Sequence, residues 1–232
     1  NRIAERVQPK MIIAGASAYS RIIDWKKFRD IADWVGAILL VDMAHYSGLI
    51  AGGEYPNPIK YADVVTSTTN KTLRGPRGGI IIWNNSEYTK KINGAIFPGT
   101  QGGPLMHVIA AKAQSFIEAN TPEFKEYCVK VKENANHMCD VFRENDIPIL
   151  TNGTDSHLIL IDLSSKKHSG KVIADKLEEN GITVNKNGIP NDPRSFIQTS
   201  GIRIGTAAET TRGHGKDWFR ELARQISTLI NG

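Results

Sequence analysis

Short apolar runs alternate with amphipathic stretches along the first half of the chain. Four of these runs predict buried strands, at residues 10–15, 37–42, 63–69 and 79–83. Between the first two, residues 24–35 carry apolar side chains three or four positions apart, which predicts a helix with one buried face. Apolar strands separated by helices indicate a parallel or mixed sheet covered on both faces. The first half is therefore predicted to be an α/β domain.

The second half has a different pattern. Helical periodicity runs over residues 104–144, with a break expected at Thr121-Pro122. Beyond residue 153 the sequence predicts, in order, a strand from residue 157, a helix from residue 170, strands at 182–184 and 201–206, and a terminal helix. We place the domain boundary near residue 120, so that residues 1–120 belong to a larger domain and residues 121–232 form a small α+β domain.

Composition narrows the class of protein. Of 232 residues, 40% are hydrophobic and 23% charged, which is typical of a globular chain, and the net charge of +5 is spread out. Without a basic stripe we expect no nucleic-acid binding. Cys128 and Cys139 form neither a disulfide framework nor a metal site, so we expect a reducing cytoplasmic setting and no metal. No apolar run predicts a membrane span and no signal peptide is apparent, and the start at Asn1 without Met indicates a missing beginning.

Two polar residues follow the second predicted strand. Asp42 ends it, and open α/β sheets bind ligands beyond the carboxyl ends of their strands. An aspartate there is also a common cap, and on its own this is the better interpretation. His45 has the same ambiguity between a ligand contact and a structural residue.

The segment 64–79 (VVTSTTNKTLRGPRGG) is harder to explain structurally. Its hydroxyl side chains at positions 66–69 can donate to phosphate or phenolate oxygens, and Lys71 can form an imine with an aldehyde. The alternative is a basic hairpin loop between two strands. Asp42 together with Lys71 favours pyridoxal phosphate, which needs a carboxylate at its pyridine nitrogen and a lysine at its aldehyde.

Two later segments carry weaker signals. Residues 97–104 (FPGTQGGP) form a glycine-rich loop before a helix, where backbone amides can bind phosphate, although an ordinary flexible loop looks the same. In GIRIGT, Arg203 alternates with Ile202 and Ile204. A guanidinium is a two-point partner for a carboxylate, although an exposed strand arginine is the commoner case.

Taken together, the motifs identify a family. VDMAH, YPNP, VVTSTTNKTLRGPRGG, FPGTQGGPLMH, VNKN, PNDP and TSGIRIGT occur in this order, and they resemble serine hydroxymethyltransferase over nearly the whole chain. The resemblance implies a fold-type-I pyridoxal-phosphate enzyme, with a mixed, mostly parallel sheet covered by helices and a small α+β domain. It also implies interconversion of serine and glycine with tetrahydrofolate, in a cytoplasmic homodimer or tetramer.

The resemblance assigns cofactor roles to matching positions. Lys71 would hold the cofactor, Asp42 would pair with its pyridine nitrogen, and His45 would lie near its ring hydroxyl or the substrate. The catalytic set would also include Thr68, which with Ser17 would hydrogen-bond within the cofactor site. The remaining cofactor contacts fall on Asn70, Gly102 and Gly103, the two glycines reaching the phosphate of a neighbouring subunit.

It assigns substrate roles in the same way. Arg203 would bind the amino-acid carboxylate. The folate contacts fall on Lys186, Asn187, Ser195, Phe196 and Ile197.

Three departures from the family pattern affect these expectations. Asn70 stands where the family has histidine, from which we expect slower exchange of Lys71 for substrate rather than lost cofactor binding. Ser195-Phe196-Ile197 stands where the family has Ser-Pro-Phe, which loosens the loop and puts its folate affinity in doubt. The family's N-terminal portion and extreme C-terminus are lacking, so we expect apolar surface to be exposed.

Other functions compete with this one. The chain could be a catalytically impaired fragment or scaffold subunit of the family. It could also be a related aldolase, such as a threonine aldolase, or an α-methylserine hydroxymethyltransferase. A nucleotide-binding domain is excluded, because neither a P-loop nor a GxGxxG motif follows a strand.

Overall fold

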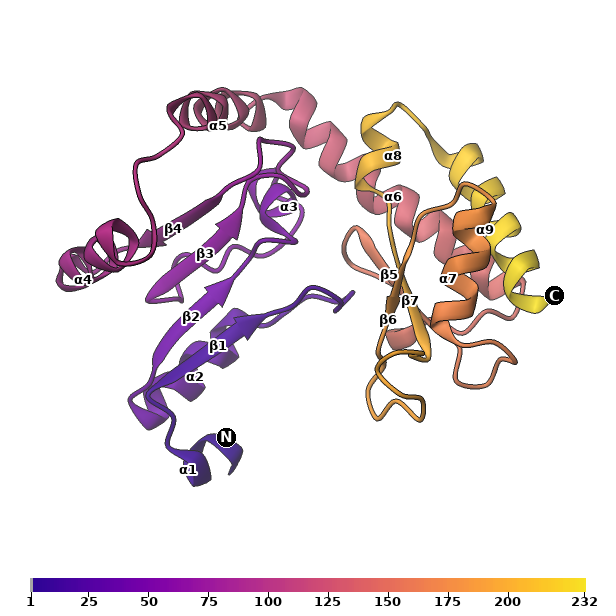
Figure 1. Ribbon diagram of the computed structural model, residues 1–232, viewed down its shortest axis with the longest axis horizontal. Coiled ribbons are helices and arrows are strands. Elements are labelled where there is room, and N and C mark those ends of the chain that lie inside the picture. The colour runs from indigo at the N-terminus through magenta and orange to yellow at the C-terminus, as the bar shows by residue number, and fades with distance from the viewer. Residues whose placement is uncertain (1) are drawn as a thin grey trace. The chain divides into compact units, whose positions relative to one another are not determined.

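The computed structural model describes residues 2–232, which divide into two units (Figure 1). The first unit runs to Ser17 and resumes from Ile23 to Lys125, and the second contains Ala18–Ile22 and Glu126–Gly232. The sequence predicts a boundary near residue 120 and gives no sign that Ala18–Ile22 joins the second unit.

The first unit is built on a four-stranded sheet. Its strands lie in the order β1-β2-β3-β4, the first three parallel and β4 antiparallel to β3, so the predicted mixed, mostly parallel sheet is confirmed. The strands are β1 (Met11–Gly15), β2 (Ile38–Asp42), β3 (Val64–Thr68) and β4 (Gly79–Trp83). The α-helices are α1 (Arg2–Val7), α2 (Trp25–Val35), α3 (Ser47–Ala51), α4 (Thr89–Gly94) and α5 (Met106–Ala119).

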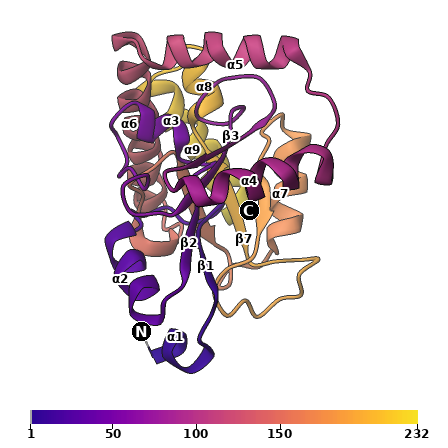
Figure 2. The same cartoon turned by 90° about the vertical axis from the view of Figure 1, so that its left-hand side faces the viewer.

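Helix α2 shows how the local sequence sets these elements. Asp24 caps its start by accepting a hydrogen bond from the Lys27 amide at 3.0 Å, and Gly36 ends it in the left-handed conformation at φ 66°. Trp25 and Ala32 form its buried face, which packs against β1 and β2 (Figure 2). The predicted helix with one buried face is confirmed.

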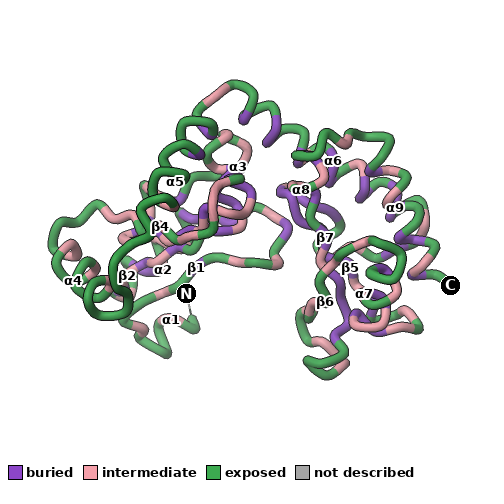
Figure 3. The backbone as a smooth tube through the Cα atoms, turned by 45° about the horizontal axis from the view of Figure 1, so that its top comes forward, coloured by how far each residue is buried: buried purple, intermediate pink, exposed green. Residues whose placement is uncertain are grey.

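Much of the first unit's apolar surface is exposed. Helices α4 and α5 are largely accessible in Figure 3, and Leu105, Met106 and Ile117 at α5 are about two-thirds exposed, at 64%, 66% and 65%. On β1, Ile13 is 70% exposed. The expected exposure of apolar surface is therefore found, whereas a sheet covered on both faces is not.

The second unit is built on an antiparallel sheet with strand order β5-β7-β6. Its elements are α6 (Pro122–Glu144, which begins in the first unit), β5 (Leu158–Asp162), α7 (Gly170–Glu179), β6 (Asn185–Asn187), β7 (Gly201–Gly205), α8 (Ala207–Thr211) and α9 (Lys216–Asn231). The predicted strand at 182–184 is wrong. Ile182 and Val184 pack against the core, and the strand forms directly after them.

The core of the second unit is dense. Phe142 of α6, Ile202 of β7, and Phe219 and Ile226 of α9 are essentially inaccessible, and they join buried residues of α7 (Figure 3). Burial raises the pKa of the Cys139 thiol to about 11, so this cysteine is unreactive at neutral pH. Within residues 2–232 there is no cluster of metal ligands and no helix able to cross a membrane.

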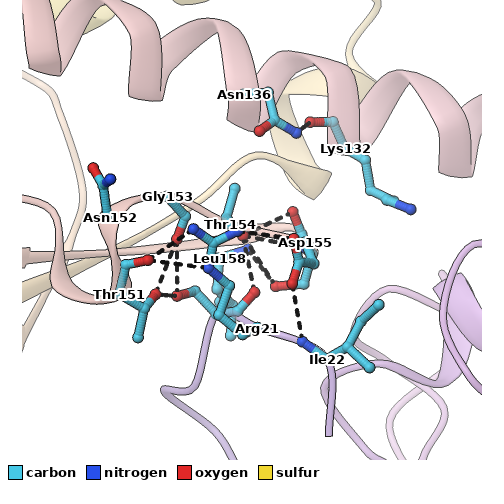
Figure 4. A network of polar contacts seen from close by, with 12 residues as sticks. Arg21, Ile22, Lys132, Asn136, Thr151, Asn152, Gly153, Thr154, Asp155 and Leu158 are labelled. Carbon is cyan, nitrogen blue, oxygen red and sulfur yellow. Dashed lines mark hydrogen bonds and ion pairs between the residues drawn. The ribbon is translucent and has the colours of Figure 1, made fainter.

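A polar network holds Ala18–Ile22 in the second unit (Figure 4). The Arg21 guanidinium donates to the Thr151 carbonyl oxygen at 2.7 Å and to the Asp155 carboxylate at 2.9 Å. The Asp155 carboxylate also accepts from the Ile22 amide, and the buried Ser20 hydroxyl lies 2.9 Å from that of Thr151. These bonds join segments that are distant in sequence, which is why no local pattern predicts them.

Candidate active site

The carboxyl ends of three parallel strands coincide at one edge of the first sheet. Strands β1, β2 and β3 lie next to one another (Figure 1), and in their ladder Gly15 pairs with Asp42 and Asp42 with Thr66. Gly15 has a φ of 145°, and a Cβ there would lie 2.4 Å from the Asp42 carbonyl oxygen, so only glycine fits. Ser17, two residues further on, is exposed. The chain thus gathers polar groups where open α/β sheets bind ligands.

The Asp42 carboxylate is held by two hydrogen bonds. One oxygen accepts from the Ala44 amide at 3.0 Å, and the other accepts from the Thr66 hydroxyl at 2.8 Å. Asp42 nevertheless remains exposed, so the carboxylate has a fixed direction and is accessible to a ligand. The sequence shows several hydroxyl side chains at positions 66–69 but gives no local sign that Thr66 is the partner of Asp42.

Lys71 lies in the connection between β3 and β4. Its ammonium donates to the Thr68 hydroxyl at 2.9 Å, and Thr68 pairs with Gly79 at the end of the ladder. The connection closes where the Thr69 amide donates to the Gly78 carbonyl oxygen at 3.0 Å. Asn70 and Lys71 are half-buried. The connection between β3 and β4 is therefore the basic hairpin loop that the sequence allows, and this same loop carries Lys71.

Thr72 ties the segment after Asp42 to the segment after Lys71. It is 2% exposed, and its hydroxyl donates to the His45 carbonyl oxygen and accepts from the Gly48 amide, both at 2.9 Å. Gly48 is required there, since a Cβ would lie 2.2 Å from the Thr72 backbone. Sequence reasoning missed Thr72, whose only signal was its place in the threonine-rich segment.

Helix α5 supports the same connection from its other end. The Lys112 ammonium donates to the Gly79 carbonyl oxygen at 2.9 Å, and the buried Ser115 lies where a Cβ on Gly75 would come within 2.7 Å of its hydroxyl. Gly102 and Gly103, in the loop before α5, are exposed, and a Cβ built on either meets nothing within 4 Å. Among the described residues, these two glycines therefore do not pack against the connection that carries Lys71.

Arg203 lies in the second unit at the centre of β7. Its neighbours Ile202 and Ile204 are buried in the core, and Arg203 itself is half-buried, which is the alternation that the sequence predicts. Its guanidinium donates to the Asn185 side-chain oxygen at 2.9 Å across a paired position of β6. The guanidinium is thus oriented by a neutral partner.

The predicted folate residues fall on β6 and the loop that follows it. The Lys186 ammonium donates to the Ile197 carbonyl oxygen at 2.6 Å, which brings these two predicted residues together. The Asn187 side chain donates to the Gly188 carbonyl oxygen. Ser195, Phe196 and Ile197 are exposed, Phe196 at 91%.

Comparison with known proteins agrees with this architecture. The family model of serine hydroxymethyltransferase matches residues 1–226. The serine hydroxymethyltransferase of Wolbachia pipientis wMel is 57% identical over 231 residues, covering 100% of this chain and 54% of the relative. That of Phenylobacterium zucineum is 56% identical over 229 residues (99% and 53%), and serine hydroxymethyltransferase 2 of Rhodospirillum rubrum is 54% identical over 230 residues (99% and 54%). The chain spans about half the length of the curated relatives it matches.

Proposed function

This chain belongs to the serine hydroxymethyltransferase family, and we propose that the full-length protein interconverts serine and glycine, with tetrahydrofolate accepting the one-carbon unit. The observation that carries the proposal is the convergence of Asp42, Thr68 and Lys71 at one edge of the first sheet. The family match favours this transfer over the aldolase and scaffold alternatives.

The residues at this edge fit pyridoxal phosphate. Lys71 offers an amine for the aldehyde, and Asp42 offers an accessible carboxylate for a protonated pyridine nitrogen. Ser17 and Thr68 offer hydroxyls to the polar substituents of the ring. When bound, the cofactor supplies the electron sink that weakens bonds at the amino-acid Cα.

The chain's own part in the reaction is to place charge and hydrogen-bond donors. Ala44 and Thr66 hold the Asp42 carboxylate, whose negative charge favours the protonated form of a ring nitrogen facing it. The Thr68 hydroxyl accepts a hydrogen bond from the Lys71 ammonium and so positions the group that would hold the cofactor aldehyde and carry a proton. In this proposal Asn70 contacts the cofactor, and His45, whose segment Thr72 fixes, lies near the ring hydroxyl or the substrate.

In the second unit, we assign the amino-acid carboxylate to Arg203, since a guanidinium binds a carboxylate through two parallel hydrogen bonds. Asn185 orients that guanidinium before substrate arrives. We assign folate to the ordered segment around Lys186 and Asn187 and to the exposed loop Ser195, Phe196 and Ile197.

We further propose that the enzyme works in the cytoplasm as a homodimer or tetramer. The family resemblance is what suggests this assembly, with the exposed loop before α5 as the segment that would reach a neighbouring subunit. The accessible Gly102 and Gly103 are available there to bind the cofactor phosphate of a neighbouring subunit.

The test is an assay of serine cleavage by the purified full-length protein, with pyridoxal phosphate and with or without tetrahydrofolate. We expect glycine and the one-carbon folate product to form together, and the rate to depend on folate. If the protein instead cleaves threonine faster than serine, at a rate that does not depend on folate, it is a threonine aldolase. If it turns over α-methylserine, it is an α-methylserine hydroxymethyltransferase.

A further inference from the structure

The loop between β6 and β7 is organised around the carboxylate of Asp192. It accepts hydrogen bonds from the backbone amides of Ile189 at 3.2 Å, Arg194 at 2.9 Å and Ser200 at 2.8 Å. Burial opposes ionisation, but the Ser200 hydroxyl and these amides outweigh it and lower the pKa of Asp192 to about 2. One side chain therefore fixes both ends of the loop.

Arg194 fastens the same loop to the rest of the second unit. Its guanidinium donates to the carbonyl oxygens of Leu163 and Lys166, each at 2.9 Å, and to the Ser200 hydroxyl at 3.2 Å. Arg194 thus binds groups on the segment after β5 and on the residue before β7. The loop is held to the unit by side chains as well as by its own backbone.

The loop also contains strained backbone. Asn191 and Thr199 adopt left-handed conformations with φ of 55° and 54°, and such a conformation is rare for a β-branched residue such as Thr199. Thr199 is 3% exposed and its carbonyl oxygen accepts from the Gly170 amide at 2.9 Å. Strain of this kind persists only where surrounding contacts over-determine it. Here those contacts come from Asp192, Arg194 and α7.

The result is a loop held by many hydrogen bonds, with an exposed tip. Phe196 and Ile197 are 91% and 65% exposed, and the Lys186 ammonium donates to the Ile197 carbonyl oxygen. A binding loop that is already ordered loses less conformational entropy when its ligand arrives.

We infer that Asp192 and Arg194 are positioning residues for folate, which preorganise the loop Ser195–Ile197 that we propose contacts it. The inference rests on the proposed function. It goes beyond that function by naming two residues that touch neither substrate nor cofactor and act through the loop alone.

The test compares Asp192→Asn with the parent full-length protein, and Asp175→Asn is the matched control because it neutralises a surface carboxylate of the same unit, one that pairs with Lys171. We expect the KM and the Kd for tetrahydrofolate to rise roughly tenfold in Asp192→Asn, because the loop must be ordered on binding. The KM for serine and the visible spectrum of the bound cofactor should stay as in the parent.

Two further measurements test whether Asp192 and Arg194 act by ordering the loop. Amide hydrogen exchange at Arg194 and Ser200 should be faster in Asp192→Asn, and Arg194→Lys should show a smaller rise in the KM for tetrahydrofolate than Arg194→Met. Unchanged folate binding despite faster exchange would overturn the inference, as would an equal loss for serine and folate. A parent that binds folate without turning over serine refutes the proposed function alone, and calorimetric Kd values then decide the inference.

Discussion

The two candidate sites of this chain are built by different physical means. At the Lys71 edge, the register of parallel strands brings Gly15, Asp42 and Thr66 to one line, and side chains a few positions away complete the site. In the loop before β7, no ladder sets the positions. The Asp192 carboxylate accepts from the Ser200 amide and the Arg194 guanidinium donates to the Leu163 carbonyl oxygen, and hydrogen bonds of this kind hold the loop together.

Because of this difference, the two sites should respond differently to single substitutions. Strand ladders distribute their stabilisation over many backbone bonds, so one side chain at the Lys71 edge can be changed without moving the others. The loop is held by a small number of side-chain hydrogen bonds, three of them from backbone amides to the Asp192 carboxylate, so substitution of Asp192 should loosen the segment. The Lys71 edge should therefore show large chemical effects with intact structure, and the loop smaller effects that arise through order.

The largest effect is expected from Lys71→Ala at the first site. Removing the amine should lower serine cleavage by about a thousandfold, within the range for loss of a nucleophilic or acid-base group. The unfolding midpoint should hardly change, since Lys71 donates to a single hydroxyl. The measurement is steady-state turnover with circular dichroism melts, and Lys26→Ala on α2 is the control. Retained turnover, or a collapsed melt, would contradict the account.

Thr66→Val should have the next largest effect. It deletes the hydroxyl donor to Asp42 in a side chain of similar shape, and a hydrogen bond to a charged group contributes about 1.5–3 kcal/mol. We expect the Kd for pyridoxal phosphate, measured by fluorescence titration, to rise about tenfold. Thr66→Ser keeps the donor and should bind like the parent. Equal binding by the Val and Ser variants would mean that Asp42 does not need this partner.

The loop gives a smaller effect that depends on pH. The pKa of Asp192 lies below its ordinary value of 3.8, at about 2, so its carboxylate stabilises the folded state fully above pH 4 and loses this contribution as pH falls toward 2. Because Asp192 is partly exposed, we expect Asp192→Asn to cost about 1 kcal/mol of unfolding free energy at pH 6. Urea unfolding at pH 6, 4 and 3 should show the gap between variant and parent narrowing. A gap that is constant with pH would refute this role.

Asn70→His should have the smallest effect. Restoring the flat, titratable ring that the family has beside the lysine should speed the exchange of Lys71 for substrate and raise turnover roughly threefold. The Kd for pyridoxal phosphate should stay unchanged. Asn70→Gln, which keeps an amide, is the control for side-chain size. If Asn70→His turns over serine at the parent's rate, the departure from the family has no kinetic consequence.

The strands of the first sheet could be predicted because hydrophobic periodicity is a local signal. The four apolar runs became β1 to β4, whereas the roles of Asp42 and Lys71 came from their combination and from the family resemblance and stay predictions. Thr72 was missed because its two partners, His45 and Gly48, follow a different strand. The Thr72 hydroxyl and the His45 carbonyl oxygen are far apart in the sequence, and only the tertiary structure brings them together.

The second site was less predictable for the same reason. Arg203 followed from the alternation with Ile202 and Ile204, but the strand predicted at 182–184 forms at Asn185–Asn187. Nothing local shows that Asp192 reaches the Ser200 amide or that Thr199 is left-handed. The motif PNDP was noted, while its role in building the loop required the structure.

The most direct test of the central claim is to locate the cofactor. The full-length protein would be incubated with pyridoxal phosphate, its visible spectrum recorded, the complex reduced with borohydride, and the modified peptide mapped. We predict a visible absorption band and a single pyridoxyl adduct on Lys71. An adduct on another lysine with Lys71 unmodified would contradict the account.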